Sequence, residues 1–410
     1  MKYKIGDLML SISDTKKMVE TDEVVFLNTG DILDGKILHE NYSKIIDLPG
    51  QAKKSIKNHD ILYSEIRPKN KRFALVEVDN PENYVVSTKL MVLRSKSNSV
   101  KIKYLYYFLT SSKVVEYLQN QAESRSGTFP QITFQELKNI EINLPSVEKQ
   151  EKIVEFMSSL DSKIELNNQI IATLEELAAT LFKRWFVDFE FPDENGNPYK
   201  SSGGKMVDSE LGEIPEGWEV GALNDIGNIV GGGTPSKKNL EYYEGGEIPW
   251  ITPKDLSDQK TVFISKGKVS ITPLGLQKSS AKMIPEKSIL FSSRAPIGYI
   301  AISRQPVSTN QGFKSVVPIN SRWSVFIYLL LQYSVINIES RATGSTFKEI
   351  SGTAMKNFPI IIPTKLIIDD FSKTVNPIFH KIDYIEKEVR SLEKVRNILL
   401  PKLLSGEIEV

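Results

Sequence analysis

The chain has 410 residues, a length that usually divides into two or three domains. Its 40% hydrophobic and 25% charged residues are typical of globular proteins and exclude a fibrous or disordered chain. The absence of cysteine excludes disulfides, thiol catalysis and cysteine-bound metal centres, and the three histidines form no paired zinc motif. The formal net charge of +1 gives no indication of a nucleic-acid partner by itself.

The sequence carries no sign of export or membrane insertion. The N-terminal segment has no apolar run of signal-peptide length, and no stretch approaches the roughly 18 apolar residues of a membrane-spanning helix. We therefore predict a cytoplasmic protein with no membrane partner.

Residues 1–145 are predicted to form a first α+β domain. Asp60–Tyr63, Phe73–Val76 and Met91–Leu93 are short β-prone runs, whereas Tyr104–Leu109 has the character of a buried helix. The region contains 21 basic and 18 acidic residues, so it is slightly positive.

Two polar, basic segments of this domain are candidates for contacts with DNA. Arginine binds guanine edges or phosphates, and serine and threonine hydroxyls reach either group. A solvated loop is the alternative for each segment. Lys53, Lys54 and Lys57 are further candidates for phosphate contacts. The candidate DNA-binding residues of the first domain are Arg67, Lys69, Asn70, Lys71, Arg72, Arg125, Ser126 and Thr128.

Residues 146–190 are predicted to form a long spacer helix. Apolar residues recur at alternating steps of four and three from Ile153 to Trp185, once Asn167 is counted as a polar seam position. This heptad spacing is typical of a coiled coil, in which a polar seam residue fixes register at some cost in stability. Residues 191–217 are polar and rich in glycine and serine, and are predicted to form a linker.

Residues 218–363 are predicted to form a second α+β domain, which holds 16 basic and 10 acidic residues. Val325–Leu331 resembles a buried helix and Ile360–Ile362 a strand. Gly227–Gly233 lacks the Gly-Lys-Ser/Thr of a P-loop and is predicted to form a tight turn. The amides of Asn310 and Gln311 suit adenine. The candidate DNA-binding residues of the second domain are Lys237, Lys238, Arg294, Asn310, Gln311, Arg341, Thr343, Ser345, Thr346 and Lys348.

Residues 364–410 repeat the pattern of a heptad helix. Apolar seam residues recur from Phe371 to Leu403, with Arg396 as a polar interruption, and Pro401 is predicted to end or kink the helix. The sequence alone leaves open whether the two long helices pair in parallel or antiparallel.

The chain repeats itself at one long, constant offset. The matches include Asp7 with Asp225, Thr128-Phe129 with Thr346-Phe347, Lys138-Asn139 with Lys356-Asn357, Pro145 with Pro363, Lys163-Ile164 with Lys381-Ile382, and Leu181 with Leu399. The register slips between Asp7 and Thr128, which indicates loops of different length. The chain is therefore predicted to be two copies of one unit, each a globular part followed by a helix.

This organisation resembles the specificity (S) subunits of type I restriction–modification systems. The resemblance covers essentially the whole chain. It depends most on Ser209–Trp218, Ile248–Leu256, Thr343–Lys348 and the two heptad segments that follow a proline. The first copy departs from the second because it lacks a counterpart of Trp218, and Phe26–Asp31 stands where the second copy has Pro249–Pro253.

The resemblance implies two target-recognition domains, separated by two long helices that pack as an antiparallel coiled coil with a pseudo-twofold internal repeat. Each domain would bind one half of a bipartite, asymmetric double-stranded DNA site. The helices would dock two methyltransferase (M) subunits, which bind S-adenosylmethionine, and motor-nuclease (R) subunits would join for restriction of phage DNA. The residues assigned to this subunit interface are Ile164, Ile171, Leu174, Leu181, Ile382, Val389, Leu392 and Leu399.

The S subunit itself would bind no cofactor or metal and perform no catalysis. Two other classes of function remain as alternatives: a coiled-coil scaffold with protein-binding globular ends, and a stand-alone methyltransferase. Sequence-specific DNA binding distinguishes the first hypothesis from the scaffold, and S-adenosylmethionine binding by the isolated chain tests the enzyme.

Overall fold

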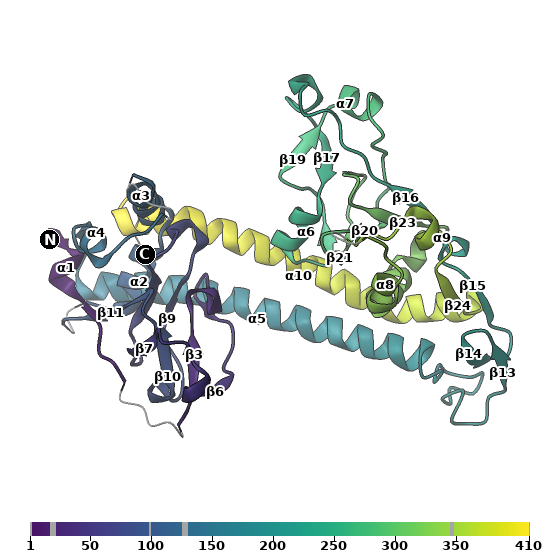
Figure 1. Ribbon diagram of the computed structural model, residues 1–410, viewed down its shortest axis with the longest axis horizontal. Coiled ribbons are helices and arrows are strands. Elements are labelled where there is room, and N and C mark those ends of the chain that lie inside the picture. Colours follow the sequence, from purple (N-terminus) through teal and green to yellow (C-terminus); the bar gives the residue numbers. More distant parts are fainter. Residues whose placement is uncertain (1, 17–21, 98–99, 125–129, 345–347, 410) are drawn as a thin grey trace. The chain divides into compact units, whose positions relative to one another are not determined.

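The computed structural model describes residues 2–16, 22–97, 100–124, 130–344 and 348–409, and has a mixed α and β architecture (Figure 1). The chain forms two compact units. Unit 1 comprises residues 1–164 and 391–410, and unit 2 comprises residues 165–390. Each unit therefore contains one sheet-rich domain together with one part of each long helix.

Two four-stranded sheets form the centre of unit 1, with strand orders β2-β11-β8-β9 and β6-β3-β10-β7. The strands are β1 (Lys2–Lys4), β2 (Met9–Ile12), β3 (Glu23–Leu27), β4 (Ile32–Leu33), β5 (Lys36–Ile37), β6 (Tyr42–Lys44), β7 (Ala52–Ser55), β8 (Ile61–Ser64), β9 (Phe73–Leu75), β10 (Tyr84–Ser87), β11 (Leu90–Ser95) and β12 (Glu141–Asn143). The shorter helices are α1 (Ile5–Leu8), α2 (Ile102–Thr110), α3 (Ser112–Glu123) and α4 (Phe134–Lys138). The predicted strands around residues 60–63, 73–76 and 91–93 and the helix at 104–109 are thus confirmed.

A five-stranded sheet of order β16-β23-β20-β21-β18 and a three-stranded sheet of order β19-β17-β22 form the centre of unit 2. The strands are β13 (Met206–Ser209), β14 (Gly212–Pro215), β15 (Glu219–Ala222), β16 (Gly227–Gly231), β17 (Ile248–Ile251), β18 (Phe263–Ile264), β19 (Val269–Ile271), β20 (Ile289–Ser293), β21 (Ile297–Ser303), β22 (Ser308–Thr309), β23 (Lys314–Pro318) and β24 (Pro359–Ile362). The shorter helices are α6 (Pro253–Gln259), α7 (Pro273–Gln277), α8 (Ser324–Ser340) and α9 (Gly352–Lys356).

The sequence repeat is also a repeat of structure. Tyr3 pairs with Ile142 between β1 and β12, and Gly221 pairs with Ile360 between β15 and β24, which is the same register at the offset of the sequence repeat. The matched aspartates form equivalent caps, because Asp7 accepts the backbone N–H of Lys4 at 2.9 Å and Asp225 that of Ala222 at 2.7 Å. Both pairings bring the first strand of a globular part to its last strand.

The departure noted at Phe26–Asp31 is a difference of side chains on a shared frame. β3 pairs in parallel with β10, as β17 does with β22. Asp31 accepts the backbone N–H of Asn28 at 2.8 Å, and Asp255 accepts that of Thr252 at 2.8 Å, so the same cap follows both strands. Phe26–Asp31 is therefore the structural counterpart of Trp250–Asp255, which contains most of the Pro-Trp-Ile-Thr-Pro stretch.

The two long helices are α5 (Val147–Phe186) and α10 (Lys365–Ser405), and each begins shortly after a proline, Pro145 or Pro363. Within unit 2, α5 contacts α10 through Asn167 with Glu388 and through Phe182 with Phe371. As the residue number increases along α5, the number of the contacting residue on α10 decreases, so the two segments run antiparallel. The predicted seam position Asn167 is 1% exposed, and its Nδ2 donates to Glu388 at 2.9 Å.

The same pairing continues within unit 1, between the first part of α5 and the last part of α10. Arg396, the predicted polar interruption, donates to Asp161 at 3.1 Å. Of the two alternatives predicted for Pro401, an end of the helix is wrong, since α10 continues to Ser405, and a kink stays a prediction. Leu403, just beyond the proline, is 4% exposed in the core of unit 1, and this burial holds the last turn in place.

Two segments that were expected to be irregular are regular. The predicted linker contains the β13–β14 hairpin, and its Phe191 ring stacks on Trp218 with 5.1 Å between centroids. Gly227–Gly231 is not a tight turn but strand β16, paired along its length with β23. Among the described residues, no helix has both the length and the apolarity needed to cross a membrane.

Candidate nucleic-acid interface

In unit 1 the chain around Arg67 pairs with the chain at residues 130–132. Ile66 forms an antiparallel bridge with Gln131, the backbone N–H of Arg67 donates to the Pro130 carbonyl at 3.1 Å, and that of Ile132 donates to Glu65 at 2.8 Å. The segment that begins at Arg67 therefore lies beside the chain that follows residues 125–129. These two stretches are far apart in the sequence, and the fold places them side by side. Residues 125–129 themselves lie outside the described residues.

Unit 2 repeats this junction with different side chains. Arg294 forms an antiparallel bridge with Glu349, which matches Gln131 at the offset of the repeat, and the backbone N–H of Ile350 donates to Ser293 at 3.0 Å. The end of β20 is also joined to the amide-rich segment, because the backbone N–H of Ser293 donates to Gly312 at 2.7 Å. The segments that carry Arg294, Gln311 and Thr343 thus converge.

The glycine-rich segment after β16 also belongs to this surface in unit 2. The backbone N–H of Gly233 donates to Thr309 at 2.9 Å, and the Thr234 hydroxyl bonds to the Gln311 side chain. A Cβ on Gly232 would lie 1.9 Å from the Asn310 carbonyl oxygen, so only glycine fits there. The exposed Lys237 and Lys238 follow this contact.

The predicted residues of the first domain take different positions. Arg67, Lys69 and Asn70 are exposed and so accessible to DNA, and Arg67 has a backbone φ of 45°, a strained left-handed conformation. Lys71 and Arg72 are engaged within the unit, since Lys71 Nζ lies 3.1 Å from Asp34 and Arg72 donates to two backbone carbonyls of residues 30–32.

The ammonium of Lys54 is also engaged, donating to the carbonyls of Thr88 and Leu90 at 3.0 and 2.8 Å. Burial lowers the pKa of Lys54. This lysine is therefore engaged within the fold, and its contact with phosphate stays a prediction. Arg125, Ser126 and Thr128 lie outside the described residues.

In the second domain the structure places several predicted residues in local contacts. Asn310 Oδ1 accepts the backbone N–H of Gly312 at 2.9 Å, which turns the chain and uses one of the groups that adenine would need. The guanidinium of Arg341 lies 5.3 Å from the centre of the Phe358 ring. Thr343 pairs with Glu349 through backbone hydrogen bonds, and Lys348 is exposed. Ser345 and Thr346 lie outside the described residues.

Sequence reasoning missed two charged residues of this surface. Glu349 accepts from Arg294 and from Lys314 at 3.3 and 3.2 Å, and neither Glu349 nor Lys314 was a candidate. The available signal was the repeat itself, because Gln131 and Glu349 follow the two matched segments at equivalent positions.

The residues assigned to the subunit interface pack mostly inside the chain. Ile164 and Ile382 are 7% and 0% exposed, and Val389 is 9% exposed. Ile171, Leu174 and Leu181 are partly buried against the core of unit 2, and Leu399 against that of unit 1, while Leu392 is partly exposed. Most of these side chains therefore contribute to the packing of the helices.

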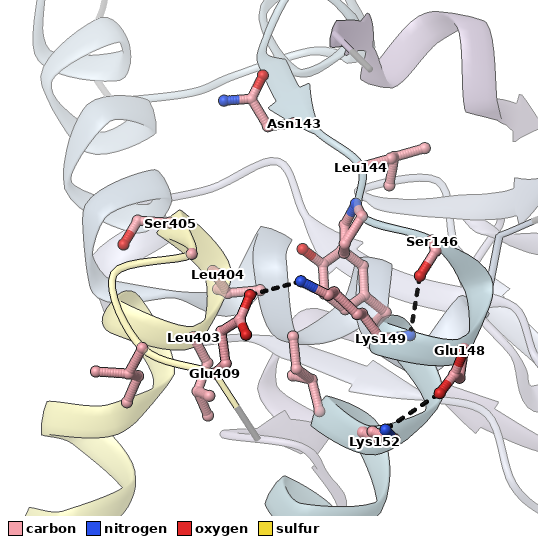
Figure 2. A pocket seen from close by; sticks show the side chains of 15 residues that line it. Asn143, Leu144, Ser146, Glu148, Lys149, Lys152, Leu403, Leu404, Ser405 and Glu409 are labelled. Carbon is pink, nitrogen blue, oxygen red and sulfur yellow. Dashed lines mark hydrogen bonds and ion pairs between the residues drawn. The ribbon is translucent and has the colours of Figure 1, made fainter.

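A hollow of about 360 Å³ lies in unit 1 between the start of α5 and the end of α10 (Figure 2). Its charged side chains pair with one another, Lys149 with Glu409 at 2.6 Å and Lys152 with Glu148 at 3.1 Å. In the described part of the chain, no three histidine or acidic side chains gather as a metal site requires. The loop surface of each unit is thus the stronger candidate site.

These features define a protein with an internal repeat. Each unit combines a polar loop surface with one part of the antiparallel helices α5 and α10. A family model described as the type I restriction modification DNA specificity domain matches residues 1–176 and again residues 215–391. The chain therefore belongs to the family of type I restriction–modification DNA specificity proteins.

Individual proteins agree with this assignment. The HindI specificity subunit of Haemophilus influenzae is 38% identical, with 99% of each chain covered. The MjaIX specificity subunit of Methanocaldococcus jannaschii is 36% identical over 48% of this chain and 45% of its own. The crystal structure of a type I restriction–modification S subunit from M. genitalium shares the fold, with a TM-score of 0.55 at 17% identity over 98% of this chain and 95% of that one.

Proposed function

We propose that the chain is the DNA-specificity subunit of a type I restriction–modification complex and recognises a bipartite double-stranded DNA site, one half with each unit. The observation that carries this proposal is the duplicated junction, Ile66 with Gln131 in unit 1 and Arg294 with Glu349 in unit 2. Equivalent backbone frames with different side chains suit two half-sites of different sequence. The site is accordingly asymmetric.

The long helices dock two methyltransferase subunits in this proposal, through exposed apolar positions rather than through the packed seam. Leu177 on α5 of unit 2 is 46% exposed, and Val395, its repeat equivalent on α10 of unit 1, is 42% exposed. Exposed large apolar residues at repeat-equivalent positions favour two identical partners, one for each copy. Leu177→Asp and Val395→Asp are each expected to remove one methyltransferase from the complex, measured as mass by light scattering.

The chemistry belongs to the partners. The methyltransferase subunits bind S-adenosylmethionine and methylate adenine, and motor-nuclease subunits join for cleavage of unmodified DNA. The chain contributes recognition and assembly in the cytoplasm, with no cofactor or catalytic group of its own.

The test is a methylome. The full chain is co-expressed with its cognate methyltransferase in a host free of adenine methylation, and the modified adenines are located by sequencing. A two-part motif with an unrecognised gap is the expected result. An assembled complex that produces no motif would overturn the proposal.

A protein-binding scaffold is the alternative, and salt titration separates it from a DNA reader. Phosphate contacts make the DNA affinity of the assembled complex fall steeply as salt rises. A scaffold gives no preference for any DNA sequence over competitor DNA at any salt concentration.

A further inference from the structure

The candidate surface of unit 2 contains an acidic side chain that pairs with two of its cations. The Glu349 carboxylate lies 3.3 Å from Nη1 of Arg294 and 3.2 Å from Nζ of Lys314. It also accepts a hydrogen bond from the Ser293 hydroxyl at 3.4 Å. A carboxylate repels phosphate, so its presence on a DNA-binding surface is not explained by affinity.

Backbone pairing fixes Glu349 relative to Arg294. The two residues form an antiparallel bridge, and Glu349 forms a second bridge with Thr343 on its other side. The neighbouring residues Ser293 and Ile350 are fully buried and joined by a 3.0 Å backbone hydrogen bond. The distance between the Cβ atoms of Arg294 and Glu349 is therefore set by the backbone pairing.

The two cations have different environments. The Lys314 side chain is 16% exposed, so its ammonium requires a nearby counter-charge, which one oxygen of Glu349 supplies. The Arg294 side chain is 37% exposed, and the other oxygen of Glu349 holds its Nη1. Among the described residues, Glu349 is the side chain to which Arg294 donates a hydrogen bond, and it does so through Nη1. The guanidinium edge formed by Nε and Nη2 is therefore available to a ligand that offers two acceptors.

The Nε–Nη2 edge of the Arg294 guanidinium matches the hydrogen-bond acceptors of guanine. A planar guanidinium edge donates two parallel hydrogen bonds, and guanine presents the matching acceptors N7 and O6 in the major groove. A guanidinium tethered through Nη1 loses less conformational freedom when it makes such a contact than an untethered one.

We infer that Arg294 recognises a guanine in one half-site and that Glu349, together with Lys314, is the positioning group that holds its guanidinium for this contact. The inference rests on the proposed function and adds the recognised base to it. Unit 1 has the neutral Gln131 at the equivalent position, where its Oε1 lies 3.5 Å from Lys89 Nζ. The acid-supported arginine is thus a property of unit 2.

The first test compares the methylation motifs of Arg294→Ala and Arg294→Lys with that of the unaltered chain, each co-expressed with the cognate methyltransferase. Lysine keeps the charge but lacks the second parallel donor, so both variants are expected to lose discrimination at one guanine, on the order of 10- to 100-fold. All other positions, including the other half-site, stay unchanged. Lys266→Ala, which removes an exposed charge of the same unit that is not a candidate for DNA contact, is the control and is expected to leave the motif intact.

The second test separates positioning from folding. Glu349→Ala is expected to relax the same guanine position while strengthening binding to non-specific DNA, because a negative charge is lost from the surface. Glu349→Gln keeps an oxygen acceptor for Nη1 and is expected to retain part of the discrimination. A merely structural role would lower specific and non-specific binding together, so that result would overturn the assignment of Glu349.

The outcomes for the proposed function and for this inference are distinct. If the unaltered, assembled complex produces no bipartite motif, the proposed function fails. If it produces the motif and Arg294→Ala changes no base, or changes both half-sites equally, only the inference about Arg294 fails.

Discussion

Unit 2 joins its recognition domain to the helix pair through a buried ion pair, whereas unit 1 uses hydrogen bonds and an exposed ion pair. In unit 2 the Glu386 carboxylate, 3% exposed on α10, accepts the backbone N–H of Val262 at 2.7 Å and an ion pair from Arg304. Arg304 also pairs with Asp383 and donates to the Phe263 carbonyl at 2.8 Å.

In unit 1 the corresponding contacts between domain and helices include no buried ion pair among the described residues. The phenol of Tyr107 on α2 donates to Asp161 on α5 at 2.7 Å, and the backbone N–H of Lys101 donates to Gln150 at 3.0 Å. Asp161 also accepts from Arg396. The backbone frame of the repeat has thus been kept while the attachment of each domain to its helices has diverged, so the two copies are expected to respond differently to substitution.

The largest effect is expected from Arg304→Ala. Removing the guanidinium leaves Glu386 buried without its ion-pair partner, at a cost of about 3–5 kcal/mol in the free energy of unfolding. Urea denaturation, combined with hydrogen exchange to locate the change in residues 165–390, measures this loss.

The matched control is Arg322→Ala, which removes an exposed arginine of the same unit and is expected to change stability little. A loss below about 1 kcal/mol for Arg304→Ala would mean that water screens these pairs as it does surface ones, and the contrast between the units would disappear.

The second effect is a pH dependence confined to unit 2. Burial, and then the charge of Glu386, raise the pKa of Glu175 on α5 to about 7. The folded state therefore holds the proton more tightly than the unfolded chain. The resulting stabilisation is complete below about pH 4.5 and is lost as pH rises through about 7. We expect a loss of about 2 kcal/mol, reduced from the full value because the side chain is partly exposed.

Glu175→Gln removes this dependence, so the variant is expected to gain stability relative to the unaltered chain as pH rises from about 5 to about 8. The matched control is Glu393→Gln, at the repeat-equivalent and exposed position of unit 1, which is expected to leave the pH profile of stability unchanged. Parallel profiles for the unaltered chain and Glu175→Gln would contradict the prediction.

The features predictable from sequence are those that recur locally or at a fixed offset. Apolar runs predicted β8, β11, α2 and α8, because each element buries a continuous face. The constant offset between matched residues predicted the duplicated architecture, and the structure repeats it down to the Asp7 and Asp225 caps.

Features that depend on pairing between distant segments were not accessible. The glycines of 227–231 favour a turn locally, but pairing with β23 imposes a strand. Arg304 and Glu386 lie far apart in the sequence, and no local pattern connects them. Glu349 is not recognisable from the local sequence either, because its importance comes from its two positively charged neighbours rather than from its own residue type.

A smaller effect is expected for Tyr107→Phe in unit 1. The substitution removes the hydroxyl that donates to Asp161, while the ring stays buried and Asp161 keeps its contact with Arg396. A single hydrogen bond to a carboxylate whose other partner remains contributes about 1 kcal/mol. Thermal unfolding of Tyr107→Phe, beside Tyr117→Phe at a 47% exposed site, measures it. A loss as large as that of Arg304→Ala would show that unit 1 is attached no more weakly than unit 2.

The smallest effect is expected where unit 1 does carry an ion pair between its helix ends. Lys149 and Glu409 are joined at 2.6 Å, but their side chains are 57% and 75% exposed. Water already solvates both charges, so Lys149→Ala is expected to change the free energy of unfolding by less than about 0.5 kcal/mol. A larger loss, measured by urea denaturation, would mean that exposed ion pairs stabilise unit 1 as much as buried ion pairs stabilise unit 2. The expected small change would instead show that burial causes the difference between the units. The Lys149–Glu409 and Arg304–Glu386 pairs both join opposite charges in direct contact and differ in their exposure to water.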